Sequence, residues 1–517
     1  MVDKTRASRS ASVRSGLLER ARRLAPNAAA GSALTDLATG LSVVEIAERR
    51  GLPPATLIGI ESFYDQLRHE PQICDGTSCH FAGGRKLADA LGLPTGTVRC
   101  LGHCYAAPSF RSGDRVFAKP SDRTLEAWIE AWGESGDPTE DVRAIPCSSL
   151  APRPVVFRNL LAGAFPAGLS DYDLPDGEAI LAAVEAARLR GRGGALYPTA
   201  AKWKVARDTA AERRWVVANG DEGDPGSFVD RLLLEQDPHA ILAGMLACAR
   251  AIAARRGIVY IRAEYPRAQR IVRDAIAQAR AAGKLGPEFD VEVVSGAGSY
   301  VCGEETALLR SIQGLRGEPW IKPPYPAVAG LHGEPTVVQN VETLAVIPWV
   351  ARNRAVTETK AVSLAGALRR PGAVEVPLGM PLRRVLELGG GGPPDGRTWS
   401  MALIGGPMGR VLPAHRFDTP LSYEALPGLG HAGIVVLDQS VRPRDLAEHL
   451  FAFARAESCG SCTPCRVGTA RLAGIRERET LERLLTTMEI GSLCGFGQSV
   501  PRPIRDLIEH YGDEVLP

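Results

Sequence analysis

The stretch RWVVANGDEGDPGSF, residues 214–228, decides the fold of the central part of the chain. It begins as a short apolar run typical of a buried strand and continues as a polar loop. Helix and strand patterns alternate around it: GEAILAAVEAARL and PHAILAGMLACARAIAA predict helices, and GIVYIRA and VEVV predict strands. This alternation predicts a mostly parallel sheet with helices on both faces, a Rossmann-like α/β domain over residues 155–355.

The rest of the chain predicts further units, because 517 residues are too many for one core. Residues 1–68 predict an N-terminal helical segment, and strand–helix–strand patterns over 69–135 suit a small thioredoxin-like unit. A polar linker follows at 136–154. Short β-like runs such as AVSLAGAL and GIVVLD predict a β-rich domain over 356–440, and helical patterns such as RETLERLLTTMEI fill 441–517.

Charge and composition exclude several classes of protein. Lysine and arginine number 61 against 59 aspartate and glutamate residues, so the net charge of +2 indicates no general nucleic-acid surface. No stretch approaches the ~20 apolar residues of a membrane helix. We therefore expect a soluble, cytoplasmic protein with no membrane or nucleic-acid partner. The basic, serine-rich start of the chain is interpreted as an arm leading into a helix, with a mitochondrial transit peptide as the alternative.

Four cysteines near the C-terminus predict an iron–sulfur cluster. Cys459, Cys462 and Cys465 form a CxxCxxC run, and Cys494 supplies a distant fourth thiol. Three thiolates in a tight loop plus one distant cysteine are the usual ligands of a [4Fe–4S] cluster. A structural zinc site is the alternative, but such sites usually pair two CxxC knuckles, and the second knuckle is missing.

A second set of four cysteines lies in the 69–135 unit. Cys74 and Cys79 form one pair and Cys100 and Cys104 another, each at the end of a predicted strand. Two such pairs can hold a [2Fe–2S] cluster at the rim of a thioredoxin-like sheet. A unit of the same fold with an empty site is the alternative. A Rieske centre does not fit, because no Cys-x-His partner precedes Cys100, and a thioredoxin-type pair would need CxxC.

Two polar loops of the central domain carry groups suited to a nucleotide. The glycines of GRGGALYPTAAKW (191–203) let backbone amides approach a phosphate or a ring edge, and Lys202 can neutralise a phosphate or an anionic reduced flavin. The second loop leaves the carboxyl end of a strand, where doubly wound sheets bind ligands. Its acidic patch can accept ribose or ribityl hydroxyls and would repel a 2′-phosphate, which favours NADH over NADPH. The patch comprises Asn219, Asp221, Glu222 and Asp224.

Three further segments add candidate contacts. The glycine turn GAGSYVCGEETALL runs into a helix, and the start of a helix favours an anion. The alternative for Glu305 is that it is an ordinary acidic residue of the first helical turn. Tyr325 in KPPYPA is suited to stacking on a base, and VVQNVETL supplies Asn340 and Thr343. Cys302 is expected to be a packed small residue rather than a nucleophile. The residues at the helix start are Gly303, Glu304 and Glu305.

Together these segments resemble the flavoprotein subunit of respiratory complex I and its soluble relatives. The resemblance covers about 155–517 and is carried by the loops above, DRLLLEQDPH, KPPYPAVAGL and ESCGSCTPCRVG with SLCGFG. Residues 16–135 resemble the small thioredoxin-like [2Fe–2S] partner subunit, fused upstream. The implied fold is multi-domain α/β: a thioredoxin-like domain, a Rossmann-like FMN/NADH domain, a ubiquitin-like β-grasp domain at 356–440 and a C-terminal helical bundle around the [4Fe–4S] cluster.

The resemblance also implies the ligands of each site. FMN would be held by Gly191, Arg192, Gly193, Gly194, Lys202, Asn219, Asp221, Glu222, Tyr300, Gly303, Glu304, Asn340 and Thr343. NAD(H) would lie near Tyr197, Asp224, Glu305, Lys322 and Tyr325, with Glu305 near the nicotinamide. Several positions depart from the family. Leu196 replaces a glycine and Gln339 an asparagine, which is expected to reshape the flavin pocket, whereas Tyr197 and Tyr325 replace phenylalanines and preserve stacking; Asp224 replaces a glutamate.

The fused arrangement is similar to the diaphorase subunit of soluble molybdenum-containing NAD-dependent formate dehydrogenases. The resemblance implies hydride exchange between NAD(H) and FMN and one-electron transfer through the clusters. The implied partners are iron–sulfur and molybdenum-type catalytic subunits, with a separate small [2Fe–2S] subunit as a further candidate. No side chain needs to act as a general base, because the cofactors carry the chemistry. The alternatives are a subunit of an NAD-reducing hydrogenase or of complex I, and a non-enzymatic electron-relay scaffold with an empty flavin pocket.

Overall fold

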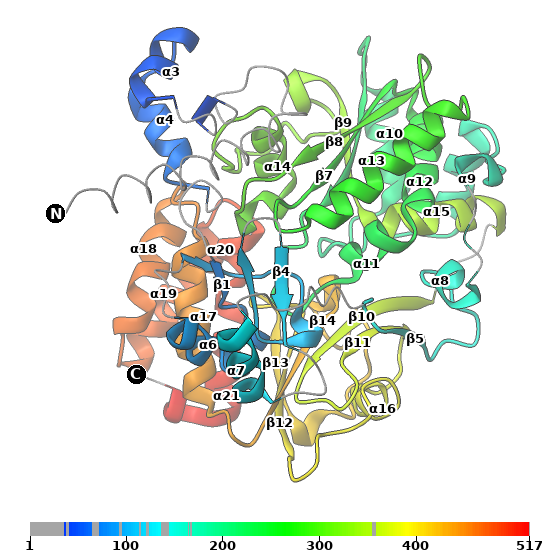
Figure 1. Cartoon of the computed structure of the whole chain (residues 1–517). Helices are drawn as coiled ribbons and strands as arrows, with labels where there is room; N and C mark the ends of the chain where they lie inside the picture. The colour runs from blue at the N-terminus through cyan, green and yellow to red at the C-terminus, as the bar shows by residue number, and fades with distance from the viewer. Residues whose placement is uncertain are drawn as a thin grey trace.

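The computed structural model describes residues 36–37, 41–64, 72–91, 96–112, 115–119, 124–135, 144–163, 165, 168–353 and 358–515. These residues form a mixed α/β fold with three sheets (Figure 1). Within the described ranges no helix is long and apolar enough to cross a membrane. The predicted N-terminal arm lies outside the described residues.

The central sheet is parallel and confirms the prediction made from residues 214–228. Neighbouring strands pair in parallel, in the order β8-β7-β6-β9. Val216, Val217 and Ala218 of β6 are fully buried, as expected for a strand covered on both faces. The strands are β6 (Trp215–Gly220), β7 (Arg256–Ile261), β8 (Asp290–Ser295) and β9 (Thr336–Asn340).

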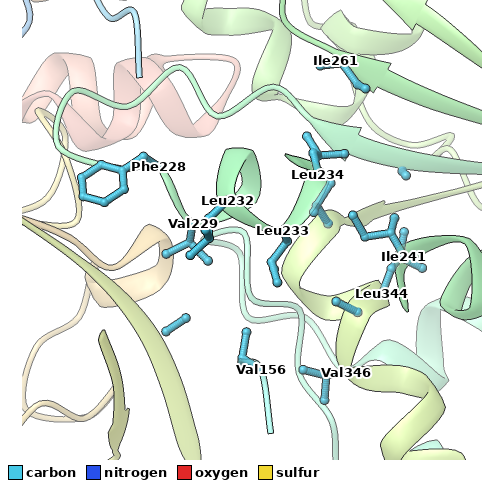
Figure 2. Packing of buried hydrophobic residues seen from close by; sticks show 14 of the residues in the cluster. Val156, Phe228, Val229, Leu232, Leu233, Leu234, Ile241, Ile261, Leu344 and Val346 are labelled. Atoms are coloured by element: carbon cyan, nitrogen blue, oxygen red, sulfur yellow. The ribbon is translucent and has the colours of Figure 1, made fainter. Parts of the chain in front are cut away.

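Helices enclose this sheet and place alternate residues of β6 in two different cores. The helices are α9 (Gly177–Ala186), α10 (Thr199–Asp208), α11 (Val229–Gln236), α12 (Pro238–Ile252), α13 (Pro266–Ala281), α14 (Glu305–Ile312) and α15 (Val341–Asn353). Val216 joins the core of α11, α12 and α15, part of which Figure 2 shows around Leu232 and Leu233. Val217 points to the opposite core, with Leu308 of α14.

A second sheet has six strands in mixed directions, and five of them confirm the β-like character of residues 356–440. Its strand order is β13-β12-β14-β10-β11-β5. β5 (Cys147–Ser149) lies in the segment predicted as a linker, and it pairs in parallel with β11. Helix α16 (Leu382–Leu388) packs on this sheet. The other strands are β10 (Thr359–Gly366), β11 (Gly372–Pro377), β12 (Trp399–Ile404), β13 (Arg410–Pro413) and β14 (Gly433–Asp438).

The N-terminal part contains two helices and a small sheet. The helices are α3 (Val43–Arg50) and α4 (Pro54–Glu61), and they pack in the same hydrophobic core as Leu308 of α14. The sheet has the order β2-β1-β3-β4, and β3 and β4 were not predicted. Its elements are β1 (Gln72–Cys74), α5 (Thr77–Phe81), α6 (Gly84–Leu91), β2 (Gly96–Val98), β3 (Ser109–Ser112), β4 (Arg115–Ala118) and α7 (Leu125–Ser135).

Five helices end the chain and lie beside the N-terminal sheet (Figure 1). They are α17 (Pro443–Glu457), α18 (Thr463–Arg471), α19 (Arg478–Gly491), α20 (Gly495–Ser499) and α21 (Pro501–Tyr511). Contact between the two parts is direct. The Thr77 hydroxyl of α5 lies 3.2 Å from Nε2 of the buried His449 in α17, and the His80 and His449 rings lie tilted to each other with centroids 4.4 Å apart. Segments far apart in sequence thus meet at the helix that leads to Cys459.

Candidate functional site

The carboxyl ends of β6 and β9 bring two predicted site residues side by side. Asn219 and Asn340 are register partners in this strand pair. The Asn219 side chain donates to the Gly303 carbonyl at 2.9 Å and accepts from the Asp221 amide at 3.0 Å. The Asn340 carboxamide oxygen accepts from the Thr343 amide at 3.2 Å, at the start of α15. These contacts gather three of the predicted polar segments at one edge of the sheet.

The glycine-rich loop closes against this edge. A Cβ atom on Gly193 would lie 2.8 Å from the Asn340 Cβ, so the loop backbone can approach only because residue 193 has no side chain. Gly194 adopts φ +121°, a conformation that favours glycine. The Arg192 amide donates to the Thr343 hydroxyl at 2.9 Å. Leu196, where the family pattern has a glycine, also has a positive φ of 55°.

Two buried acceptors around this edge lack a partner among the described residues. They are Oδ2 of Asp221 and Oε1 of Gln339. Burial raises the pKa of Asp221 well above its ordinary value. Buried polar atoms normally have hydrogen-bond partners, so an orphaned pair marks a place where a ligand donor fits. The ribityl hydroxyls of FMN are donors of this kind, and the residues present therefore fit the flavin.

Lysine–glutamate pairs border the same strand ends, where Lys202 also donates to the Val338 carbonyl of β9 at 3.1 Å. The region bordered by these pairs, the glycine-rich loop and the acidic loop is called the cleft below. Lys202 of α10 lies 3.0 Å from Glu305, and Lys322 lies 2.8 Å from Glu304 and 4.0 Å from Glu305. Glu304 also caps α14 by accepting from the amides of Thr306 and Ala307. Each glutamate of this group is thus paired with a lysine, so the charges of the group offset one another. Tyr197 and Tyr325 are more than half exposed, so their rings are open to solvent for stacking.

The four C-terminal cysteines converge around α18 and α20. Cys459, Cys465 and Cys494 are buried, and Cys462 is partly buried. Burial is the main cause that raises the pKa of Cys465 to about 12 and that of Cys494 to about 11. The other three cysteines of the set contribute to the shift at Cys465, and Cys459 contributes at Cys494. Such mutual effects require the four sulfurs to lie close together.

Backbone amides point at these sulfurs. The Leu493 amide lies 3.5 Å from the Cys462 sulfur, and the amides of Phe496 and Gly497 donate to Cys494. Amide donors stabilise the negative charge of cluster thiolates, and metal binding removes the thiol protons. Four converging thiols with amide donors fit an iron–sulfur cluster.

One residue connects the cleft with the C-terminal cysteines. The Tyr300 hydroxyl donates to Asp224 at 2.5 Å, and its amide donates to Glu457 at the end of α17 at 3.0 Å. Its ring packs edge-on against Phe453 and, tilted, against Phe496, two residues beyond Cys494. The Glu304 carboxylate is also near enough to raise the pKa of Cys494, after burial and neighbouring thiols. The cleft and the cysteine loop therefore share a wall.

The N-terminal cysteines also converge, and they lie against the acidic loop of the central domain. The Cys100 and Cys104 sulfurs are 3.7 Å apart. The Cys79 thiol donates to Cys74, which lowers the pKa of Cys74 to about 7. The Gly226 amide donates to the Cys104 sulfur at 3.2 Å. All four sulfurs are buried and interact electrostatically, so this set too has the character of a metal-thiolate site.

Two predicted cofactor contacts turn their side chains into the protein instead. The Glu222 carboxylate accepts from the Ser227 hydroxyl and from the amides of Asp230 and Arg231, which caps α11. The Arg192 guanidinium is buried and donates to Glu342 at 2.8 Å. Both side chains therefore position the loops rather than face the cleft.

Sequence reasoning missed a residue contributed by the six-stranded sheet. His431, just before β14, lies 3.3 Å from the Asp224 carboxylate, and its ring covers Gly194. The signal that could have found it is the glycine density of GLGHAG around this histidine. Cys302 is buried, and burial raises its pKa, in keeping with the expected packing role.

Comparison with known proteins places these features in one family. Three family models match: the Nuo51 FMN-binding domain over residues 184–349, the SLBB domain over 361–412, and the iron–sulfur binding region of NADH-ubiquinone oxidoreductase-F over 445–517. The NADP-reducing hydrogenase subunit HndC of Solidesulfovibrio fructosivorans is 42% identical over 64% of this chain and 74% of its own length. The chain belongs to the family of FMN- and iron–sulfur-containing NADH dehydrogenase subunits.

Two further proteins are similar to the chain, one in sequence and one in both sequence and structure. The mitochondrial NADH-ubiquinone oxidoreductase 51 kDa subunit of Neurospora crassa is 37% identical over 65% of this chain and 76% of that protein. A crystal structure of an NAD+-reducing [NiFe]-hydrogenase superposes with a TM-score of 0.82 and 33% identity, covering 93% of this chain and 92% of that one. The chain is thus an NAD-dependent oxidoreductase subunit with an FMN-binding domain and a [4Fe–4S]-binding region.

Proposed function

We propose that this chain exchanges a hydride between NAD(H) and FMN and passes single electrons through iron–sulfur clusters to or from partner subunits. The observation that carries the proposal is the wall shared by the cleft and the C-terminal cysteines, with Tyr300 between Asp224 and Phe496. When bound, FMN takes up two electrons as a hydride and releases them one at a time. The chain's own residues bind the cofactors, orient them and adjust their properties.

The proposed roles follow from the contacts. The residues that would face FMN are Gly191, Gly193, Gly194, Lys202, Asn219, Asp221, Tyr300, Gly303, Glu304, Asn340 and Thr343, with Arg192 and Glu222 positioning the loops. Those near NAD(H) would be Tyr197, Asp224, Glu305, Lys322 and Tyr325. The cluster ligands would be Cys459, Cys462, Cys465 and Cys494 for [4Fe–4S], and Cys74, Cys79, Cys100 and Cys104 for [2Fe–2S]. We propose NADH rather than NADPH as the nucleotide, because the Asp224 carboxylate would lie beside it and would repel a 2′-phosphate.

Asp221 provides the experiment that tests the flavin site. Asp221→Ala removes the orphaned acceptor, so the purified variant is expected to lose most of its FMN and its NADH–ferricyanide activity. The matched control is Asp290→Ala at the opposite end of the sheet, where Asp290 pairs with Arg280 on the surface. If Asp221→Ala retained FMN at the wild-type level, the proposed location of the flavin site would be wrong. A wild-type protein that binds no FMN would favour the electron-relay scaffold.

We further propose that the electrons come from formate, through a molybdenum-containing partner subunit, and reduce NAD. The support is the resemblance of the fused N-terminal unit to formate dehydrogenase diaphorases. A hydrogenase is the second candidate, because HndC and the solved hydrogenase are both similar to the chain. Isolation of the native complex distinguishes them: molybdenum with formate-dependent NADH formation supports the first proposal, and nickel with hydrogen-dependent formation supports the second.

A further inference from the structure

The segment that follows α14 is packed against the end of the N-terminal helix α4. The buried Tyr64, just after α4, donates to the Leu315 carbonyl at 2.6 Å. A Cβ atom on Gly317 would lie 2.4 Å from the Cys302 sulfur and 3.2 Å from the Phe63 ring. The N-terminal segment therefore fixes the position of this loop of the central domain.

Arg316 of this loop contacts both the N-terminal segment and the C-terminal cysteine loop. Its guanidinium lies 5.0 Å from the centroid of the Phe63 ring, which is within the range of a cation–π contact. It donates to the Cys459 carbonyl at 2.5 Å, and its Nε lies 3.0 Å from the Glu318 carboxylate. Phe63 also packs against the hydrophobic cluster that contains Cys459. One guanidinium thus joins Phe63 to the first cysteine of the CxxCxxC run.

The Cys459 carbonyl belongs to a tight turn that ends in a hydrogen bond to the Cys459 sulfur. The Ser461 amide donates to this sulfur, and Gly460 between them adopts φ +77°, a conformation that favours glycine. The Gly460 carbonyl accepts from Arg466 at 2.7 Å. Because peptide groups are planar, a held carbonyl also fixes the amide of its own peptide group. Arg316 and Arg466 each hold one of the two successive peptide groups that lead to the Ser461 amide.

A hydrogen bond to a ligand sulfur affects the reduction potential of an iron–sulfur cluster. Reduction adds one negative charge to the cluster, and an amide donor stabilises that charge. The donor therefore favours the reduced form, and a turn that loses this hydrogen bond lowers the midpoint potential. The charge of Arg316 acts in the same direction, but Glu318 opposes it and the side chain is partly exposed to screening solvent. The hydrogen bond and the charge need separate tests.

We propose that Arg316 is a positioning residue for the [4Fe–4S] cluster. By holding the Cys459 carbonyl, it keeps the Ser461 amide directed at the Cys459 sulfur and raises the reduction potential of the cluster. Phe63 contacts the guanidinium and keeps it in place, so the N-terminal helical segment acts on a site near the other end of the chain. The inference rests on the proposed C-terminal ligand set and extends it by naming the residues that set its potential.

Three substitutions in the full chain test the proposal. Arg316→Met removes the donor and the charge, Arg316→Lys keeps a charge and a donor, and Phe63→Leu removes only the aromatic ring. Each protein is titrated potentiometrically, the reduced [4Fe–4S] centre is followed by electron paramagnetic resonance, and iron and FMN are counted. The expected result is a lower [4Fe–4S] midpoint potential in Arg316→Met, recovery toward wild type in Arg316→Lys, and a smaller lowering in Phe63→Leu.

A second readout reports the hydrogen bond itself. Pulsed electron paramagnetic resonance after exchange into D2O measures the coupling between the reduced cluster and the deuterons nearest to its sulfurs. Arg316→Met is expected to weaken the strongest of these couplings, because the Ser461 amide no longer points at the Cys459 sulfur. Loss of the charge alone would leave that coupling unchanged.

Arg383→Met serves as the matched control. Arg383 of α16 makes the same three kinds of contact in the unit of the six-stranded sheet. Its guanidinium lies 5.9 Å from the Phe417 ring centroid, pairs with Asp418 at 3.2 Å and donates to the Ala414 carbonyl at 3.0 Å. Its side chain is 35% exposed, against 34% for Arg316. Arg383→Met is expected to leave the [4Fe–4S] midpoint and the deuteron coupling unchanged.

The outcomes separate the inference from the proposed function. A wild-type chain without any [4Fe–4S] signal overturns the C-terminal cluster and the inference together. A wild-type chain with the signal, and an Arg316→Met variant with full iron and an unshifted midpoint, overturns the inference alone. A lowered midpoint with an unchanged deuteron coupling overturns the positioning role. If Arg316→Met loses its iron, Phe63→Leu decides, and an unshifted midpoint in that variant overturns the inference.

Discussion

Cys494 and Cys248 are both buried thiols, and their surroundings separate a ligand from a core residue. Amides of Phe496 and Gly497 donate to Cys494, which also interacts with Cys459. Cys248 is buried in α12, where burial alone raises its pKa and no other cysteine contributes. Cys494→Ser is therefore expected to abolish the [4Fe–4S] centre while FMN remains bound, and Cys248→Ser to leave iron content unchanged. Iron analysis and visible spectra measure both, and an intact cluster in Cys494→Ser would contradict the ligand assignment.

At the same scale, residue types could be predicted from the sequence but side-chain directions could not. Asn219, Asp221 and Asn340 lie at the strand ends where the pattern indicated ligand contacts. Glu222 and Arg192 are also polar and lie in the same two loops as the predicted contacts, yet their side chains turn into the protein. Glu222 accepts from an amide at the start of α11, and Arg192 pairs with Glu342. The choice depends on donors from remote segments, which no local pattern contains.

At the scale of elements, a buried ion network fixes the glycine-rich loop. Glu342, in the first turn of α15, binds the guanidinium of Arg192 and the ammonium of Lys360 from β10. All three side chains are at most 4% exposed. Breaking such a network leaves an unpaired buried charge, which costs about 3–5 kcal/mol. Glu342→Gln is expected to lower the free energy of unfolding by about that amount and to speed FMN release.

The control for this substitution is Glu448→Gln on α17. Glu448 pairs with Arg444 at 3.0 Å, but both side chains are about half exposed. Such surface pairs contribute about 0.3–0.5 kcal/mol. Denaturant unfolding with FMN fluorescence measures both variants, and equal effects would refute the role of the buried network.

The same network predicts a pH dependence. Burial acts to raise the pKa of Glu342, but Lys360 and Arg192 outweigh it, and the net pKa is lowered from 4.5. A lowered folded-state pKa gives stability that is present above pH 4.5 and is lost as the pH falls through the folded-state value. The stability difference between wild type and Glu342→Gln should therefore shrink on acidification below pH 4.5. Unfolding free energies from pH 7 to pH 3 test this, and a constant difference would contradict it.

Elements with strong patterns were predicted, and those defined by distant partners were not. α12, α19 and β6 confirm the runs that predicted them. β5 has only three residues and is a strand because it pairs with β11, more than two hundred positions away. Likewise β9 completes the central sheet by pairing with β6, although its segment was interpreted only as a source of polar contacts.

At the scale of the whole molecule, both cysteine sets contact segments of the proposed flavin site. The acidic loop touches the N-terminal set through Gly226 and the C-terminal side through Asp224 and Tyr300. The sequence identified both sets, but their placement depends on contacts such as Arg262 with Cys100 and Thr77 with His449. These are interfaces between segments that local patterns treat as separate units.

The central claim is that electrons can pass between NAD(H), FMN and a [4Fe–4S] cluster held by the four C-terminal cysteines, and addition of NADH tests this path in the reverse direction. The most direct measurement is electron paramagnetic resonance of the FMN-loaded chain, frozen anaerobically after addition of NADH. We predict the signal of a reduced [4Fe–4S] centre in the wild type, and its absence in Cys494→Ser although NADH still bleaches the flavin absorbance. A wild-type chain whose flavin is bleached by NADH while its [4Fe–4S] centre stays oxidised would contradict the account.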